Sequence, residues 1–129
     1  MHQERKEDKM SLYAMLLTSF ILFAITACLG VTQVGIREMM RRNPPATVTM
    51  LHGLPAAAGL TLLLYATFAI GVPRLAIVAL ILFLIAAGGG AVLNLVYHQR
   101  GQILPRGLMY LHMLLAVVGF ILLAIAVFA

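Results

Sequence analysis

The sequence predicts an all-α protein, a compact integral membrane bundle of four helices. Three observations support this fold class. Hydrophobic residues make up 63% and charged residues only 10% of the 129-residue chain, which is more apolar surface than a soluble domain of this size can bury. Four long stretches contain no Asp, Glu, Lys or Arg. The second half of the chain also resembles the first at an offset of sixty residues.

The four uncharged stretches have the length of membrane spans, since about 20 mostly apolar residues cross the roughly 30 Å hydrocarbon core of a bilayer. They comprise residues 11–34, 46–70, 75–97 and 107–129. Backbone polar groups in hydrocarbon must pair within the chain, and none of these stretches alternates like a barrel strand. Each is therefore expected to be a helix in contact with the lipid bilayer, preceded by a polar N-terminal tail over residues 1–10.

The internal repeat predicts how these helices are grouped. Ten of the twenty residues 50–69 recur identically at 110–129, where a shared Leu- and Ala-rich composition gives about two or three matches. The same offset relates Pro45 to Pro105 and Gly30 to Gly90. We therefore expect two tandem two-helix hairpins, 11–70 and 71–129. Both would enter the membrane from the same side, as a parallel repeat with a pseudo-two-fold axis along the membrane normal.

The basic residues lie in the tail and the connections, so the net charge of +5 indicates no nucleic-acid partner. The positive-inside rule counts Lys and Arg on each side. The connections after the first and third spans carry five: Arg37, Arg41, Arg42, Arg100 and Arg106. The opposite side carries four: Arg5, Lys6, Lys9 and Arg74. This small difference favours termini outside the cytoplasm, in a bacterial inner membrane.

Two histidines are the only residues of the Asp, Glu, Lys, Arg and His set inside the spans, His52 and His112. Each follows Pro45 or Pro105 by seven residues, which places it about 10 Å into its helix at 1.5 Å per residue. The repeat sets both at the same depth on facing helices. An ionisable side chain in a span is costly and is by default a functional candidate, and the obvious partner of each histidine is the other.

Two imidazoles facing each other across a four-helix core suit the axial positions of a haem iron. Gly59 and Gly119 each follow a histidine by seven residues, two turns along the same helix face. They are expected to let a flat macrocycle approach the backbone. Gly30 and Gly90 lie at about the depth of the histidines and are expected to clear space for the edges of the macrocycle.

The haem propionates need cationic partners, and these are expected among Arg41, Arg42, Arg100 and Arg106. The hypothesis is a membrane electron-transfer protein with one b-type haem near this Arg-rich face, ligated by His52 and His112. It would exchange electrons with a quinol or a protein partner. Whether the chain is an oxidoreductase that performs net catalysis, and whether it forms a homodimer, stays open.

Four spans and two His-x6-Gly elements, His52 to Gly59 and His112 to Gly119, resemble the architecture of small b-type membrane cytochromes of the cytochrome b561 group. The resemblance implies a haem-bearing helical bundle. Members of that group often carry two haems and four histidine ligands, with one pair near each face. This sequence has no second pair at the opposite depth, so it predicts electron exchange at one side rather than relay across the membrane.

Other interpretations of the histidine pair remain. The two side chains can be packing residues that hydrogen-bond neighbouring helices, in a structural or anchor subunit of a larger complex. A small transporter that uses the pair in place of an intramembrane carboxylate is a second alternative. Copper is the metal alternative, because thioethers with imidazole suit Cu(I). Methionines lie on the same side: Met39, Met40, Met50, Met109 and Met113.

Two further polar residues lie at the end of the third span. His98 is expected to be an interfacial residue beside Tyr97, with a proton or quinone contact near the haem edge as the functional alternative. Asn94 is expected to donate a hydrogen bond to another helix.

Overall fold

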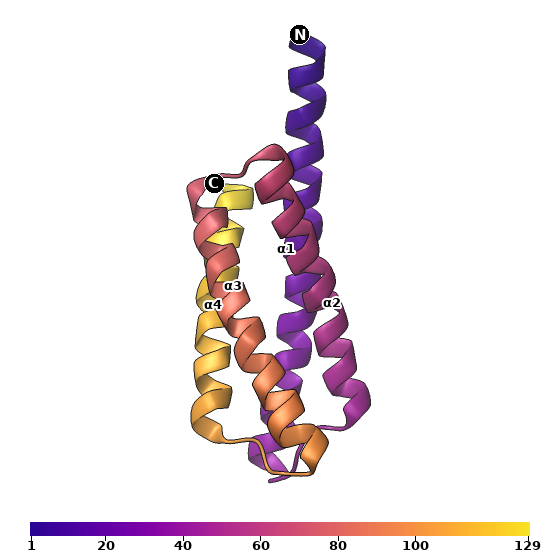
Figure 1. Cartoon of the computed structure of the whole chain (residues 1–129), viewed down its shortest axis with the longest axis vertical. Coiled ribbons are helices and arrows are strands. Elements are labelled where there is room, and N and C mark those ends of the chain that lie inside the picture. Colours follow the sequence, from indigo (N-terminus) through magenta and orange to yellow (C-terminus); the bar gives the residue numbers. More distant parts are fainter.

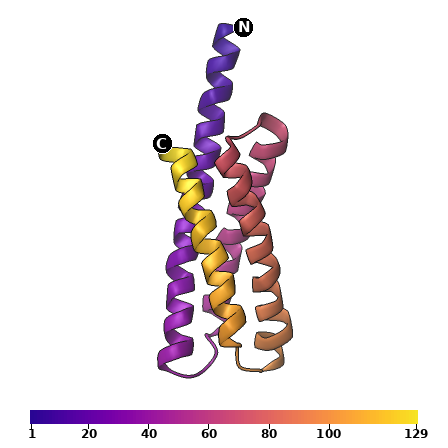
Figure 2. The same ribbon diagram turned by 90° about the vertical axis from the view of Figure 1, so that its left-hand side faces the viewer.

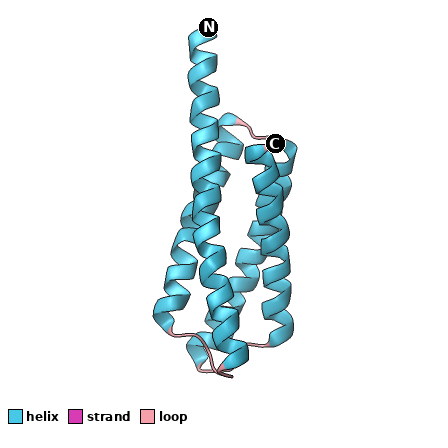
Figure 3. Ribbon diagram, turned by 180° about the vertical axis from the view of Figure 1, so that it is seen from behind, coloured by secondary structure: helices cyan, strands magenta, loops and turns pink.

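A computed structural model describes all 129 residues, and it is helical throughout apart from its connections (Figure 3). Helix α1 spans His2–Met39, and α2 spans Ala46–Tyr65 with a π-helical last turn, η1, at Ala66–Ile70. Helix α3 spans Arg74–Val92 and continues through a π-helical turn, η2 (Leu93–Tyr97), and a 3₁₀ turn, η3 (His98–Arg100). Helix α4 spans Arg106–Phe128. The predicted all-α fold with four helices is confirmed.

All four helices are long and apolar enough to cross a membrane. The structure extends the first of them at both ends, because α1 begins at His2 and ends at Met39 rather than covering only 11–34. The expected polar tail continues the helix beyond the bundle (Figure 1). Its sequence lacks Gly and Pro and is rich in good helix formers, and Glu4 lies in the first turn, where a negative charge is favourable.

The chain folds as two antiparallel hairpins, α1 with α2 and α3 with α4, which pack against each other (Figures 1 and 2). The connections 40–45 and 101–105 lie at one end of the bundle, which we call the loop end. The α2–α3 connection and the C-terminus lie at the other end, together with the point where α1 leaves the bundle. We call this the terminal end.

Proline and glycine mark the helix boundaries. Pro45, Pro73 and Pro105 immediately precede α2, α3 and α4, where the missing N–H of proline leaves no intrahelical bond unmade. Gly71 ends η1 with φ of +92° and donates its N–H to the Ala66 carbonyl oxygen, 2.9 Å away. Glycine suits this position because residues with a Cβ rarely adopt such a φ.

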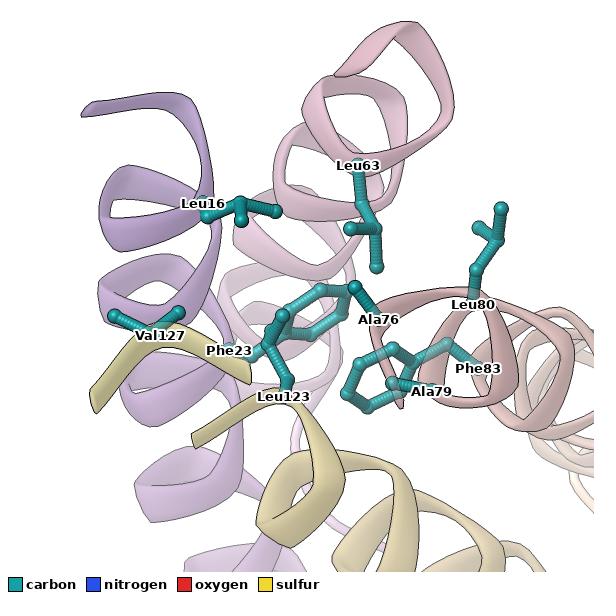
Figure 4. Close-up of a cluster of buried hydrophobic side chains, with 9 residues drawn as sticks. All are labelled: Leu16, Phe23, Leu63, Ala76, Ala79, Leu80, Phe83, Leu123 and Val127. Carbon is teal, nitrogen blue, oxygen red and sulfur yellow. The ribbon is translucent and has the colours of Figure 1, made fainter. Parts of the chain in front are cut away.

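The core is narrow and lies toward the terminal end (Figure 4). Only 19 of the 129 residues are buried, so most apolar side chains face outward and need an apolar surrounding. The central contact is a stack of Phe23 on Phe83, with ring centroids 3.9 Å apart and planes 11° from parallel. The other cluster members surround these rings: Leu16, Leu63, Ala76, Ala79, Leu80, Leu123 and Val127.

Hydrogen bonds between the two connections join the hairpins at the loop end. Asn43 donates from Nδ2 to the Gln102 carbonyl oxygen at 2.6 Å and accepts at Oδ1 from the Leu104 N–H at 3.0 Å. Arg37 donates from Nε to the Leu104 carbonyl oxygen at 3.0 Å. Arg106 pairs with Glu38, Nε to Oε1, at 2.9 Å. These contacts fix how the hairpins align.

Candidate functional site

His52 projects from α2 and is held by α1 of the same hairpin. Its Nδ1 lies 2.9 Å from the Thr26 carbonyl oxygen. A carbonyl oxygen only accepts hydrogen bonds, so Nδ1 carries the proton and donates. In the neutral ring, the lone pair is then on Nε2. This is the arrangement in which a histidine binds metal, with its other ring nitrogen donating to a carbonyl that fixes tautomer and orientation.

His112 is held in the same way within the second hairpin. Its Nδ1 donates to the Ala86 carbonyl oxygen at 2.7 Å. Ala86 follows Thr26 by the same sixty residues that separate His112 from His52. The identity of the side chains at 26 and 86 does not matter to this contact, because only their backbone carbonyls take part. The two imidazoles are therefore positioned by equivalent backbone contacts.

The two rings lie close together between the hairpins. Their centroids are 6.2 Å apart and their planes differ by 65°. Two imidazoles bound end-on to one metal ion through Nε2, at about 2.0 Å per bond, would hold their centroids about 6 Å apart. Neither Nε2 has a protein hydrogen bond, yet the chain contains no fully buried side-chain nitrogen without a partner. Both Nε2 atoms are therefore reachable from open space.

Gly30 and Gly90 make room for the imidazoles. A Cβ on Gly30 would lie 3.1 Å from Cε1 of His52, and a Cβ on Gly90 would lie 3.0 Å from Cε1 of His112. Both distances are too short for an undisturbed contact. The sequence indicated that these glycines clear space for the macrocycle, whereas in the structure they accommodate its expected ligands.

Gly59 and Gly119 serve a different contact from the one expected. A Cβ on Gly59 would lie 3.2 Å from the ring of Phe23, and one on Gly119 would lie 3.1 Å from the ring of Phe83. These glycines admit the stacked phenylalanines instead of a macrocycle. The stack comes from residues three positions before Thr26 and Ala86, so it fills the core one turn from the histidines on the side of the terminal end.

The four arginines expected at the propionates all lie at the loop end, and one of them is already engaged. Arg106 pairs with Glu38. The side chains of Arg41, Arg42 and Arg100 are exposed, and Arg42 contacts the Met40 sulfur at 3.6 Å. These three cations have no acidic partner within the chain.

No three side chains of the His, Cys, Asp and Glu set gather anywhere in the chain. A site made of protein ligands alone, as copper or zinc would use, is therefore incomplete. Of the methionines on this side, Met39, Met40 and Met50 are exposed, Met113 is half-buried, and Met109 is buried beside Leu93 and Leu104. A haem iron needs only two protein ligands, because the macrocycle supplies the other four nitrogens. The two histidines therefore fit a haem better than a copper or zinc ion.

Comparisons with protein-family models, with curated proteins and with solved structures find no match. Any function assigned to the histidine pair therefore rests on its own geometry and on the surrounding residues.

The sequence did not reveal three parts of this site. The carbonyls of Thr26 and Ala86 carry no side-chain signature. Phe23 and Phe83 were visible only as members of a repeated Ile-Leu-Phe triplet. The groove between α2 and α3 was also hidden: the sequence offered Asn94 as a donor to another helix, whereas in the structure its side chain makes no hydrogen bond within the chain and lines this groove.

Proposed function

We propose that this chain is an integral membrane electron-transfer protein that holds one b-type haem between His52 and His112. The observation that carries the proposal is the matched pair of imidazoles. Each donates Nδ1–H to a backbone carbonyl and leaves Nε2 free, and the ring centroids are 6.2 Å apart. The bound haem would supply reversible one-electron chemistry at its iron.

The chain's own residues would fix the ligands. The Thr26 and Ala86 carbonyls orient the imidazoles, and Gly30 and Gly90 let them lie against α1 and α3. Preorganisation of this kind raises metal affinity, because outer contacts to ligating histidines are typically worth 10–100-fold. The propionates would approach the loop end, where Arg41, Arg42 and Arg100 are exposed.

The membrane setting belongs to the same proposal. The outward surface of all four helices is largely apolar, which suits lipid. The contacts of His52, Gly30, Phe23 and Gly59 recur sixty residues later, which supports a tandem duplication of one hairpin. We place the histidines nearer the loop end and assign that end to the cytoplasmic side by its five arginines.

The test is a visible absorption spectrum of detergent-purified protein from haem-replete cells, first oxidised and then reduced with dithionite. A sharp Soret band with the split reduced bands of low-spin b haem is expected. A colourless protein that contains no iron would overturn the proposal. Metal analysis of the same sample would then separate a copper protein from one whose histidines only join helices.

A further inference from the structure

A groove of about 300 Å³ lies between α2 and the end of α3. Its walls are formed by Ala46, Thr49, Met50, Gly53, Leu54, Asn94, His98 and Gln99. Gly53 directly follows His52, so the groove reaches the depth of the imidazoles and extends from there toward the loop end. A volume of this size is at the lower bound of pockets that bind small organic molecules.

The two halves of the chain differ in the residues that line this groove. The equivalent interface lies between α4 and α1, where small groove residues are replaced by large ones. Met109 stands in the position of Thr49, and Met113 in that of Gly53. Met109 is buried. The two interfaces between the hairpins therefore differ in the size of their side chains, and the groove lies at the one with the smaller residues.

The polar residues of the groove also have no polar equivalent, or a differently bonded one, at the interface between α4 and α1. His98 takes the place of Glu38, which is bound to Arg106 across the equivalent interface. Asn94 takes the place of Val34. The amide of Asn94 is half-buried and has no hydrogen-bond partner, although it lies on a helix apolar enough to cross a membrane. No side-chain amide of the chain is both fully buried and unpaired, so the Asn94 amide keeps accessible surface in the groove and can meet a ligand there.

The backbone of α3 is altered at the same residues. Asn94 lies within the π-helical turn η2, Leu93–Tyr97, while the equivalent segment of α1 remains α-helical to Met39. Single π-helical turns inside helices occur frequently at functional sites, because the extra residue changes the direction of the side chains. Just beyond this turn, Nε2 of His98 donates to the Pro44 carbonyl oxygen at 2.7 Å, which leaves its Nδ1 as an acceptor.

We propose that this groove binds the headgroup of a lipid-soluble quinone or quinol. A flat ring with oxygen atoms matches its chemistry: a ligand carbonyl accepts from the Asn94 amide, and a ligand hydroxyl donates to Nδ1 of His98. Met50 and Leu54 offer apolar contact to the ring and its tail. The inference rests on the proposed function, because electron transfer at the histidine pair is the reason for a quinone to bind here.

The test uses the full chain in lipid nanodiscs with a photoreactive azidoquinone, and unlabelled decylubiquinone as competitor. Crosslinked residues are mapped by mass spectrometry. Labelling is expected in residues 46–54 and 94–99 and is expected to be displaced by the competitor. Labelling spread evenly over the lipid-facing helix surfaces, or not displaced, would overturn the proposal.

Two variants introduce the side chains found at the equivalent positions of the other half of the chain. Gly53→Met introduces the residue of the equivalent position, and nothing lies within 4 Å of a Cβ there, so the new side chain enters the groove without disturbing the fold. Asn94→Val replaces the amide with the side chain of the equivalent position, Val34. Each is expected to lower displaceable labelling about tenfold. Gly88→Met is the matched control, since its Cβ also meets open space but lies outside the groove.

The two proposals fail separately. The labelling assay does not depend on haem absorbance, so it can be carried out on protein of any haem content. Specific labelling of a colourless protein would support the groove and overturn the haem. A haem spectrum that is normal in Gly53→Met, together with labelling equal to that of Gly88→Met, would overturn the groove and leave the haem in place.

Discussion

The rings of Phe23 and Phe83 stack at 3.9 Å between centroids and join the two hairpins inside the core. Each ring packs against a glycine on its partner helix, Gly59 or Gly119, with no space for a Cβ between them. The stack lies one helical turn from the histidine pair. It therefore joins α1 and α3 close to the Thr26 and Ala86 carbonyls that hold the imidazoles.

Removal of one ring should loosen this contact without unfolding the chain. Phe→Ala in a water-soluble core typically costs about 3–5 kcal/mol. We expect about 2 kcal/mol for Phe23→Ala, because lipid is as apolar as the lost contact and only packing is forfeited. Thermal unfolding in detergent measures the effect. Phe68→Ala, whose ring is 83% exposed, should change little; equal losses in both variants would contradict the role of the stack.

The histidine pair should behave as a unit in haem binding. His52→Ala and His112→Ala should each abolish the low-spin reduced spectrum, because one remaining imidazole cannot complete the axial pair. The measurement is haem absorbance per mole of purified protein. His98→Ala is the control, as its ring is bound to the Pro44 carbonyl and should leave the spectrum intact. A low-spin spectrum retained in both alanine variants would exclude these ligands.

The glycines that face the imidazoles allow a sharper test, since they leave the ligands themselves unchanged. Gly90→Val places its Cβ 3.0 Å from Cε1 of His112 and should displace the ring. We expect haem affinity to fall by 10–100-fold, the range typical of disturbed outer contacts. Gly88→Val, two residues earlier with nothing within 4 Å, should bind haem normally. Similar affinities for the two variants would argue against preorganised ligands.

Asn43 is the residue on which the alignment at the loop end depends most. Asn43→Ala removes both of its hydrogen bonds and leaves the N–H of Leu104, a buried residue, without a partner. The expected loss is about 1–3 kcal/mol in the free energy of unfolding. Gln102→Ala keeps the backbone carbonyl that Asn43 uses and should be nearly neutral. Chemical unfolding of both variants in detergent provides the comparison, and a harmless Asn43→Ala would show that the connections are independent.

The orientation is testable on living cells. Reporter fusions at the C-terminus should be active outside the cytoplasm, and fusions within 101–105 inside it, if the five arginines of the loop end govern insertion. Substitution of Arg41 and Arg42 by Ala reverses the imbalance to three against four. Mixed or inverted topology is then expected. Unchanged topology would mean that other features decide insertion.

The sequence by itself predicted the four helices, because in lipid the backbone groups of apolar stretches of span length must pair within each stretch. Short connections predicted that neighbouring helices are antiparallel. It also singled out His52 and His112, since two ionisable residues at one offset are conspicuous among apolar neighbours. Gly30 and Gly90 emerged from the same offset, but their function did not, because a glycine shows only that a side chain is missing and not what fills the space.

Only the tertiary structure decided which atoms meet. The Thr26 and Ala86 carbonyls that hold the imidazoles are backbone groups, and every residue carries one, so no residue pattern marks them. The difference between the two interhairpin interfaces was equally hidden. In the sequence, Thr49 and Gly53 are ordinary small residues of an apolar helix. Their place in a groove depends on the position of α3. Packing between helices is set by the shapes of both partners, and the groove between α2 and α3 becomes visible only when both helices are in place.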